Sequence, residues 1–169
     1  PTAAEQTPRP QLSDAARSVW AKSPDAEGRW LPLWQHLDDA ATVAGALFDL
    51  WLPTAAQRIL ADPFGGDIEA ARCAAMFLAG THDIGKATPA FAVQDSMLAA
   101  RMCAQGLAVP ATPAELLDRS RVPHALAGHH LLCRWLLARG WSPRRVPAWA
   151  VVVGGHHGVP PDSITVANG

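Results

Sequence analysis

The chain has 169 residues, 49% of them hydrophobic, and a formal net charge of −1 at pH 7. This length suits one domain with a single core, whether the domain stands alone or is a fragment of a longer protein. The near-neutral charge excludes a uniformly basic surface and argues against a stand-alone protein that binds nucleic-acid duplexes. No apolar run approaches the roughly 20 residues that cross a bilayer, and residues 1–16 lack the pattern of a signal peptide. We therefore expect a cytoplasmic protein without a membrane partner.

The first half of the chain contains residue types that are typical of helix ends, and its apolar residues have helical periodicity. Ser13 and Thr54 are residue types that cap helix N-termini, and the Pro/Gly-bearing segments 23–28 and 63–67 indicate loops. Apolar residues recur at helical intervals between these signals. The helices that we expect here span about residues 13–20, 33–51, 54–61 and 68–81, and the last of them is nearly all apolar, as in a buried central helix.

The second half continues in the same way. Thr88–Pro89 and Thr112–Pro113 are pairs typical of the first positions of a helix, and Gly140 lies where a helix often ends. Residues 149–153 could form a buried strand, but this run is short and its surroundings are helical. We expect a helix with a break over 88–105, a short turn at 112–113, a helix over 124–139, and a last one from Ser142 into 151–158. The chain shows no repeat and no alternating strand pattern, so the predicted class is all-α, a compact helical bundle.

The cysteines and tryptophans do not by themselves predict a site. Cys73, Cys103 and Cys133 are odd in number, lie in apolar helical stretches and form no CxxC motif, so we expect reduced residues of the core. The seven tryptophans could stack on nucleic-acid bases, but we assign them to the aromatic part of the core, because the chain has no tyrosine. Trp34 and Trp149 are nearest in sequence to the candidate ligands described below.

The histidines are the residues that suggest a metal site. The seven histidines fall mostly at the ends of predicted helices or in the adjoining loops, where several could converge. His82 and Asp83 are adjacent where an apolar helix ends, so both side chains can turn toward one point. An imidazole with a carboxylate that can bridge suits Mn, Fe, Co or Ni better than structural zinc, which favours thiolates. His156 and His157 lie among glycines, in a turn that either aims both rings inward or leaves them solvated.

His124 begins the predicted helix over 124–139 and can face the same site. At about 100° per residue, Gly128 falls on nearly the same face and would let another backbone come close. His129 and His130 project about 140° and 240° round the helix from His124. We therefore expect these two histidines either at the surface or in contact with the ligands without binding the metal.

Lys86 lies three residues after Asp83 and has three interpretations. It could be solvated, it could pair with the Asp83 carboxylate, or it could bind a phosphate or stabilise a leaving oxyanion beside a metal.

Hydrolysis of a phosphodiester needs a nucleophile at neutral pH and neutralisation of the phosphate charge, and one or two divalent metal ions supply both. Histidine ligands suit this chemistry, because they hold a transition metal and leave positions open for water and substrate.

Five short motifs follow one another along the chain: WAKS at 20–23, QHLDDAATVA at 35–44, THDIGKATPAF at 81–91, PHALAG at 123–128 and GGHHG at 154–158. Their order resembles the HD superfamily of metal-dependent phosphohydrolases, and more narrowly the HD nuclease domain of the CRISPR-associated nuclease-helicase of type I systems. The likeness runs from Trp20 to Gly158. We therefore expect a partly flexible N-terminal segment over residues 1–19, an HD nuclease domain over 20–158, and a tail over 159–169 that leads into a C-terminal part outside this sequence.

The resemblance implies a helical domain that nicks and degrades single-stranded DNA at a centre of one or two divalent transition metal ions, Mn, Fe, Co or Ni, with Mg as an alternative. It implies catalytic roles for Asp83, as the bridging carboxylate, and for Lys86 beside the centre. It also implies two sets of metal ligands: His36, His82 and Asp83 for one ion, and His124, His156 and His157 for the other. The partners implied are the single-stranded DNA substrate, an RNA-guided type I surveillance complex that delivers it, and a helicase domain linked covalently or separately.

One ligand of the family pattern is not found. That pattern ends with a further aspartate, which completes the metal held by the first two ligand motifs. Asp162 is the one carboxylate side chain of residues 159–169, and it lies in a loop-like PPDS segment, so we expect the first metal position to be incomplete. Two alternatives remain open. A nucleotide phosphohydrolase or cyclic-nucleotide phosphodiesterase would seal its pocket around one nucleotide, and a non-catalytic helical domain would bind a partner and no metal.

Overall fold

The computed structural model describes residues 11–110, 112–116 and 122–161, and within them the regular elements are helices and one short hairpin. The α-helices are α1 (Asp14–Ser18), α2 (Leu33–Leu50), α3 (Thr54–Ala61), α4 (Ile68–Ala79), α5 (Pro89–Ala92), α6 (Ser96–Ala104), α7 (His124–Ala138) and α8 (Val146–Gly154). The 3-10 helices are η1 (Asp62–Phe64), η2 (Ile84–Ala87) and η3 (Pro113–Glu115), and the strands β1 (Trp20–Lys22) and β2 (Leu31–Pro32) pair antiparallel. The all-α class is confirmed. In the described ranges, no helix has the length and apolar character needed to cross a bilayer.

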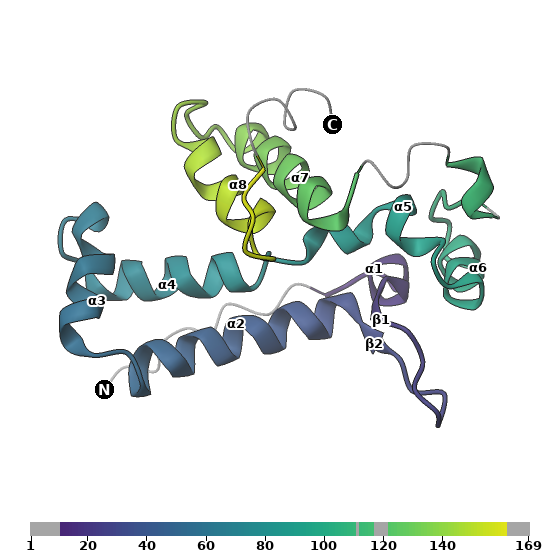
Figure 1. The fold of residues 1–169 in the computed structure, drawn as a ribbon, viewed down its shortest axis with the longest axis horizontal. Coiled ribbons are helices and arrows are strands. Elements are labelled where there is room, and N and C mark those ends of the chain that lie inside the picture. The colour runs from purple at the N-terminus through teal and green to yellow at the C-terminus, as the bar shows by residue number, and fades with distance from the viewer. Residues whose placement is uncertain (1–10, 111, 117–121, 162–169) are drawn as a thin grey trace.

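Two long helices, α2 and α4, lie side by side along the length of the molecule, and α3 closes one end of the pair (Figure 1). α7 and α8 pack against each other, and α7 also packs on η2. α1, the hairpin, α5 and α6 gather near the beginning of α2 (Figure 1). The start of α2, the segment between α4 and η2, the start of α7 and the turn after α8 are therefore close enough to build one site.

Side-chain hydrogen bonds cap the N-termini of several of the predicted helices. The Ser13 side chain accepts a backbone N–H at the start of α1, and Asp67 and Asp95 do the same for α4 and α6. Gly140 has a φ of 80° just beyond α7, the left-handed conformation expected after a helix end. The predicted break falls between α5 and α6, and η3 forms at the predicted turn.

The predicted helix over residues 13–20 is wrong at its C-terminal end. α1 stops at Ser18, because Val19 adopts extended backbone and Trp20 enters β1. The Val19 carbonyl accepts a hydrogen bond from the Leu33 N–H at 2.8 Å, which ties the hairpin to the start of α2. Strands of three and two residues are too short to show alternating hydrophobicity, so the sequence carried no signal for them.

Two helix starts also differ from the prediction. Pro53 is the N-cap of α3, and Thr54 is the first residue of the helix instead of its cap. α8 begins at Val146, because the segment that follows Ser142 forms a turn before the helix. Neither change moves a candidate ligand.

The prediction of three core cysteines is wrong for two of them. Cys73 and Cys103 are exposed, Cys133 is partly buried, and all three are free thiols. Cys73 lies two residues after Ala71, which is the one fully buried residue of α4, and so projects about 200° away from it. α4 is thus less buried than its apolar sequence suggests, since it packs on α2 along one face and leaves another open.

Two glycines allow η2 to lie directly against α7. A Cβ atom on Gly85 would overlap the carbonyl oxygen of His124, and one on Gly128 would lie 3.3 Å from the Gly85 nitrogen. The close backbone approach expected at Gly128 is therefore confirmed. It brings the segment that follows Asp83 next to the first turn of α7.

Candidate metal centre

All the side chains predicted as metal ligands converge on one point. They come from four separate parts of the fold: His36 from the first turn of α2, His82 and Asp83 from the turn between α4 and η2, His124 from the first position of α7, and His156 and His157 from the turn after α8. Asp83 lies at the centre of this group and is buried, with its side chain 6% exposed. The site therefore depends on the mutual packing of helices that are far apart in sequence.

The two oxygens of Asp83 face different partners. Oδ2 lies 2.8 Å from His36 Nε2, 2.8 Å from Lys86 Nζ and 3.2 Å from His82 Nε2. Oδ1 lies 3.3 Å from His124 Nε2 and 3.2 Å from His156 Nε2. The carboxylate thus separates two groups of histidines and can contribute one oxygen to each group.

Backbone carbonyls fix the tautomers of two histidines. The Nδ1 atoms of His82 and His156 lie 2.7 Å from the carbonyl oxygens of Ala79 and Val153, each three residues earlier in the chain. A carbonyl oxygen can only accept, so each Nδ1 carries the hydrogen. In the neutral ring, Nε2 then presents its lone pair toward Asp83.

The site has two clusters with the spacing of metal ligands. In the first cluster, His36, His82 and Asp83, the ligand atoms lie within 4.8 Å of one another. The same is true of the second cluster, which comprises His124, His156 and His157. Within the second cluster, Nε2 of His124 and Nε2 of His157 are 2.9 Å apart.

The residues present fit a divalent cation. Asp83 Oδ1 and His156 Nε2 are both buried and face each other at 3.2 Å, yet neither has a hydrogen-bond partner in the described part of the chain. Two lone pairs in this arrangement repel, and buried polar atoms without partners are unfavourable. A cation between them would satisfy both atoms. The donor set of imidazoles and one carboxylate suits Mn, Fe, Co or Ni.

Electrostatics keep the central carboxylate charged. Burial alone would raise the pKa of Asp83, but the hydrogen bonds from His82, Lys86 and His36 outweigh burial and hold this pKa well below its usual range. The Asp83 contact raises the pKa of His82, whereas burial lowers the pKa of His124. Protons therefore compete with a metal ion less for His124 than for His82.

The family model for the HD domain of Cas3 matches residues 20–168. The chain belongs to the Cas3 HD domain family. It is 31% identical over 163 residues to the CRISPR-associated nuclease/helicase Cas3 of Streptococcus thermophilus, in a match that covers 88% of this chain and 17% of the relative. It is also 33% identical over 149 residues to the CRISPR-associated endonuclease/helicase Cas3 of Thermus thermophilus, with 88% and 15% covered.

A solved structure supports the same assignment. The crystal structure of a CRISPR-associated protein matches with a TM-score of 0.76 and 30% sequence identity, over 92% of this chain and 17% of that chain. The present chain thus spans only 15 to 17% of the Cas3 relatives and of this structure. The resemblance inferred from the five motifs is confirmed at the level of the Cas3 HD family.

In this member of the Cas3 HD family, Lys86 points at the central carboxylate. Its ammonium lies 2.8 Å from Asp83 Oδ2, donates to the Ala21 carbonyl at 3.2 Å, and lies 5.4 Å from the ring centroid of Phe91. Its side chain is only 13% exposed. Of the three interpretations of Lys86, the solvated one is wrong and the ion pair with Asp83 is present. A role in binding phosphate remains a prediction.

His129 and His130 lie outside the two clusters. His129 is 4% exposed, so the surface alternative is wrong for this residue. It is buried where α7 meets α8, with its Cβ beside Gly154. Burial lowers its pKa. Its Nε2 lies 3.7 Å from the Cys133 sulfur. Asp162, the weakest candidate ligand, falls outside the described residues.

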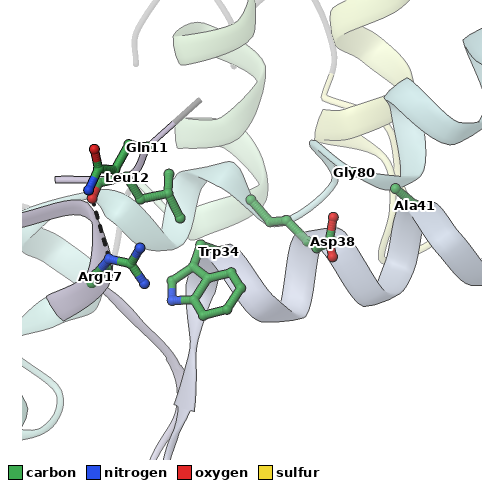
Figure 2. Close-up of a pocket in the computed structure, with 8 residues that line it drawn as sticks. Gln11, Leu12, Arg17, Trp34, Asp38, Ala41 and Gly80 are labelled. Atoms are coloured by element: carbon green, nitrogen blue, oxygen red, sulfur yellow. Dashed lines mark hydrogen bonds between the residues drawn. The ribbon is translucent and has the colours of Figure 1, made fainter. Parts of the chain in front are cut away.

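The two tryptophans nearest to the ligands in sequence have different surroundings. Trp34 lines a surface pocket with Arg17, whose guanidinium lies 6.0 Å from the indole centroid (Figure 2). This face of α2 is turned away from His36, which is two residues and about 200° further round the helix. Trp149 packs in an aromatic group with Phe64, Phe77 and Trp141. The prediction of a packing role therefore fits Trp149 better than Trp34.

The sequence did not reveal the groups that support the ligands. The carbonyls of Ala79 and Val153 are backbone atoms, which carry no residue-type signal, and Ala21 reaches Lys86 from a strand 65 positions away in sequence. Phe91 is part of a quoted motif, but its contacts with His124 and Lys86 depend on the fold.

Proposed function

We propose that this chain is the nuclease part of a CRISPR-associated nuclease/helicase and hydrolyses phosphodiester bonds of single-stranded DNA during CRISPR interference. We further propose that residues 20–158 form the nuclease domain. One observation carries the proposal: the buried carboxylate of Asp83 presents its two oxygens to two separate groups of histidines. The Cas3 relatives, whose names include nuclease and helicase, support it.

The cofactor would be one or two divalent transition metal ions. A bound ion of this kind lowers the pKa of a coordinated water and offsets charge on the scissile phosphate. His36, His82 and Asp83 would hold one ion, and His124, His156 and His157, with Asp83, the other. Mn, Fe, Co and Ni suit these imidazole-rich sets, whereas Mg is the weaker alternative because it prefers oxygen ligands.

The chain's own groups prepare the site for this chemistry. In the neutral rings, the carbonyls of Ala79 and Val153 place the hydrogen of His82 and His156 on Nδ1 and leave each Nε2 as the ligand atom. Lys86 supplies a fixed positive charge beside Asp83 Oδ2. His157 is exposed whereas Asp83 is buried, so the substrate phosphate would approach from the side of His157.

The partners belong to the same proposal. The substrate would be a displaced single strand of DNA, delivered by an RNA-guided type I surveillance complex. A helicase domain, in the same polypeptide or in a separate one, would feed that strand to the metal centre. The word helicase in the names of both relatives supports this arrangement.

The test is a nuclease assay with Mn(II) or Co(II) on single-stranded DNA, duplex DNA, mononucleotides and cyclic nucleotides. We expect metal-dependent cleavage of single-stranded DNA that a chelator abolishes. Hydrolysis of mononucleotides or cyclic nucleotides in its place would favour a nucleotide phosphohydrolase or phosphodiesterase. Absence of metal binding by calorimetry would favour a non-catalytic binding domain.

A further inference from the structure

Phe91, in α5, contacts residues on both sides of the central carboxylate. Its ring centroid lies 5.7 Å from that of His124, with an interplanar angle of 69°, and 5.4 Å from the Lys86 ammonium. His124 is the partner of Asp83 Oδ1, and Lys86 is the partner of Oδ2. One aromatic ring therefore touches a neighbour of each carboxylate oxygen.

His124 and His157 differ from His82 and His156 in how their rings are held. His82 and His156 donate from Nδ1 to backbone carbonyls, and His36 is bonded to Asp83 itself. In the described part of the chain, the one hydrogen bond of the His124 ring joins its Nε2 to Nε2 of His157, and these are the two atoms that would bind a metal. A ligating histidine usually has its second nitrogen fixed by a partner. Among the described residues, none forms a hydrogen bond with Nδ1 of His124.

Packing against Phe91 can take the place of that bond. The Phe91 ring stacks on Trp20 at a centroid distance of 4.4 Å, and it packs on the buried cluster that contains Trp20, Leu98 and Met102. An edge-on contact from a ring held in this way restricts rotation of the His124 imidazole. The orientation of His124 would then come from the hydrophobic core.

Local hydrogen bonds fix the distance between Phe91 and Lys86. The Lys86 N–H donates to the Asp83 carbonyl at 2.9 Å, the Thr88 hydroxyl donates to the Gly85 carbonyl at 2.7 Å, and the Phe91 N–H donates to the Thr88 carbonyl at 3.1 Å. This series spans the nine consecutive residues from Asp83 to Phe91. The ammonium can thus rest on the ring face while it contacts Asp83, an arrangement that stabilises a cation.

We infer that Phe91 is a positioning residue of the metal centre, which orients the His124 imidazole and the Lys86 ammonium toward the two oxygens of Asp83. This inference rests on the proposed metal-dependent function. It assigns a role in metal binding to the PAF segment that follows the HDIGK motif, although no atom of Phe91 would touch the metal.

The test compares Phe91→Leu and Phe91→Met, which remove the ring, with Phe91→Tyr, which retains it. Phe77→Leu is the matched control, because Phe77 is also partly buried and its ring contacts, with Trp135 and Trp149, involve no candidate ligand. Co(II) affinity is measured by calorimetry, the coordination geometry by the visible absorption of bound Co(II), and the stability of the metal-free protein by thermal unfolding in chelator.

We expect Phe91→Leu and Phe91→Met to weaken the tighter Co(II) site by about 10- to 100-fold and to alter its spectrum, as loss of an orienting partner typically does. Phe91→Tyr should retain both properties, and Phe77→Leu should lower the melting temperature with no change in affinity. Unchanged Co(II) affinity in a folded Phe91→Leu or Phe91→Met protein would overturn the inference. So would an equal loss of affinity in Phe77→Leu. Failure of the wild-type protein to bind Co(II) would instead refute the proposed function.

Discussion

Gly85 lies against the carbonyl oxygen of His124 so closely that no side chain could stand between them. Gly85 is the second residue after Asp83, and His124 is the first residue of α7. This backbone contact therefore sets the distance between the carboxylate and one of its histidine partners. Close backbone packing therefore requires glycine at this position of the HDIGK motif, independently of metal chemistry.

Gly85→Ala should destabilise the protein by about 2 to 3 kcal/mol, because the new methyl group meets backbone that cannot move without shifting α7. Thermal or urea unfolding in chelator measures this change. Gly45→Ala is the control, since a Cβ there meets mainly the flexible ends of Met76 and Arg72. A Gly85→Ala protein as stable as Gly45→Ala would show that the contact is looser than the structure indicates.

Asp83→Asn should weaken binding of every metal ion by at least about 100-fold and reduce DNA cleavage to background, because Asp83 belongs to the first cluster and its Oδ1 faces His124 and His156 of the second. Asp49→Asn is the control, since Asp49 is a carboxylate paired with Arg72 away from the site. Calorimetry with Mn(II) and a cleavage assay on single-stranded DNA measure the two effects. Residual cleavage above one tenth of the wild-type rate would contradict the bridging role.

The sequence predicted the helices well where their ends carry local signals. Ser13 acts at a helix start through its side chain and Gly140 at a helix end through its backbone angle, so their effect can be predicted from residue type. The hairpin at Trp20 could not be predicted in this way, because its two short strands exist only through pairing with each other and with the start of α2. The exposure of Cys73 likewise depends on which face of α4 meets α2.

The candidate ligands could be named from the sequence because the five motifs resemble those of the HD nuclease domain, and because His82–Asp83 and His156–His157 are adjacent pairs of groups that bind metals. The structure adds what no residue type encodes, namely the assignment of His36 and His82 to one oxygen of Asp83 and of His124 and His156 to the other. Such a division depends on the packing of four helical segments.

Metal affinity should fall as the pH drops through about 6.5, since protons compete with the ion for the imidazole nitrogens. Contact with Asp83 raises the pKa of His82, so this ring binds a proton up to a higher pH, and metal binding near neutral pH should release it. Burial lowers the pKa of His124, which therefore competes less. Calorimetry in buffers of different ionisation enthalpy counts the released protons. An affinity that is flat between about pH 8 and 5.5 would be incompatible with histidine ligands.

Lys86→Met should strengthen metal binding at the cluster of His36, His82 and Asp83 by roughly tenfold, because it removes a cation 2.8 Å from Asp83 Oδ2 that opposes a divalent ion. Lys22→Met, which removes an exposed lysine of β1, is the control. Calorimetry with Co(II) gives the affinities, and cleavage kinetics give KM for single-stranded DNA. A raised KM with unchanged metal affinity would show instead that Lys86 acts on the substrate phosphate.

The chain should bind one metal ion tightly, at the cluster of His124, His156 and His157, and a second at least about tenfold more weakly. Asp83 Oδ1 has no hydrogen-bond partner in the described part of the chain and can complete four ligands with these three imidazoles. Oδ2 already contacts His36 and Lys86, and the first cluster contains no carboxylate besides Asp83. Titration with Mn(II) or Co(II) counts the sites. Two sites of equal affinity would mean that a further carboxylate, such as Asp162 outside the described residues, completes the first position.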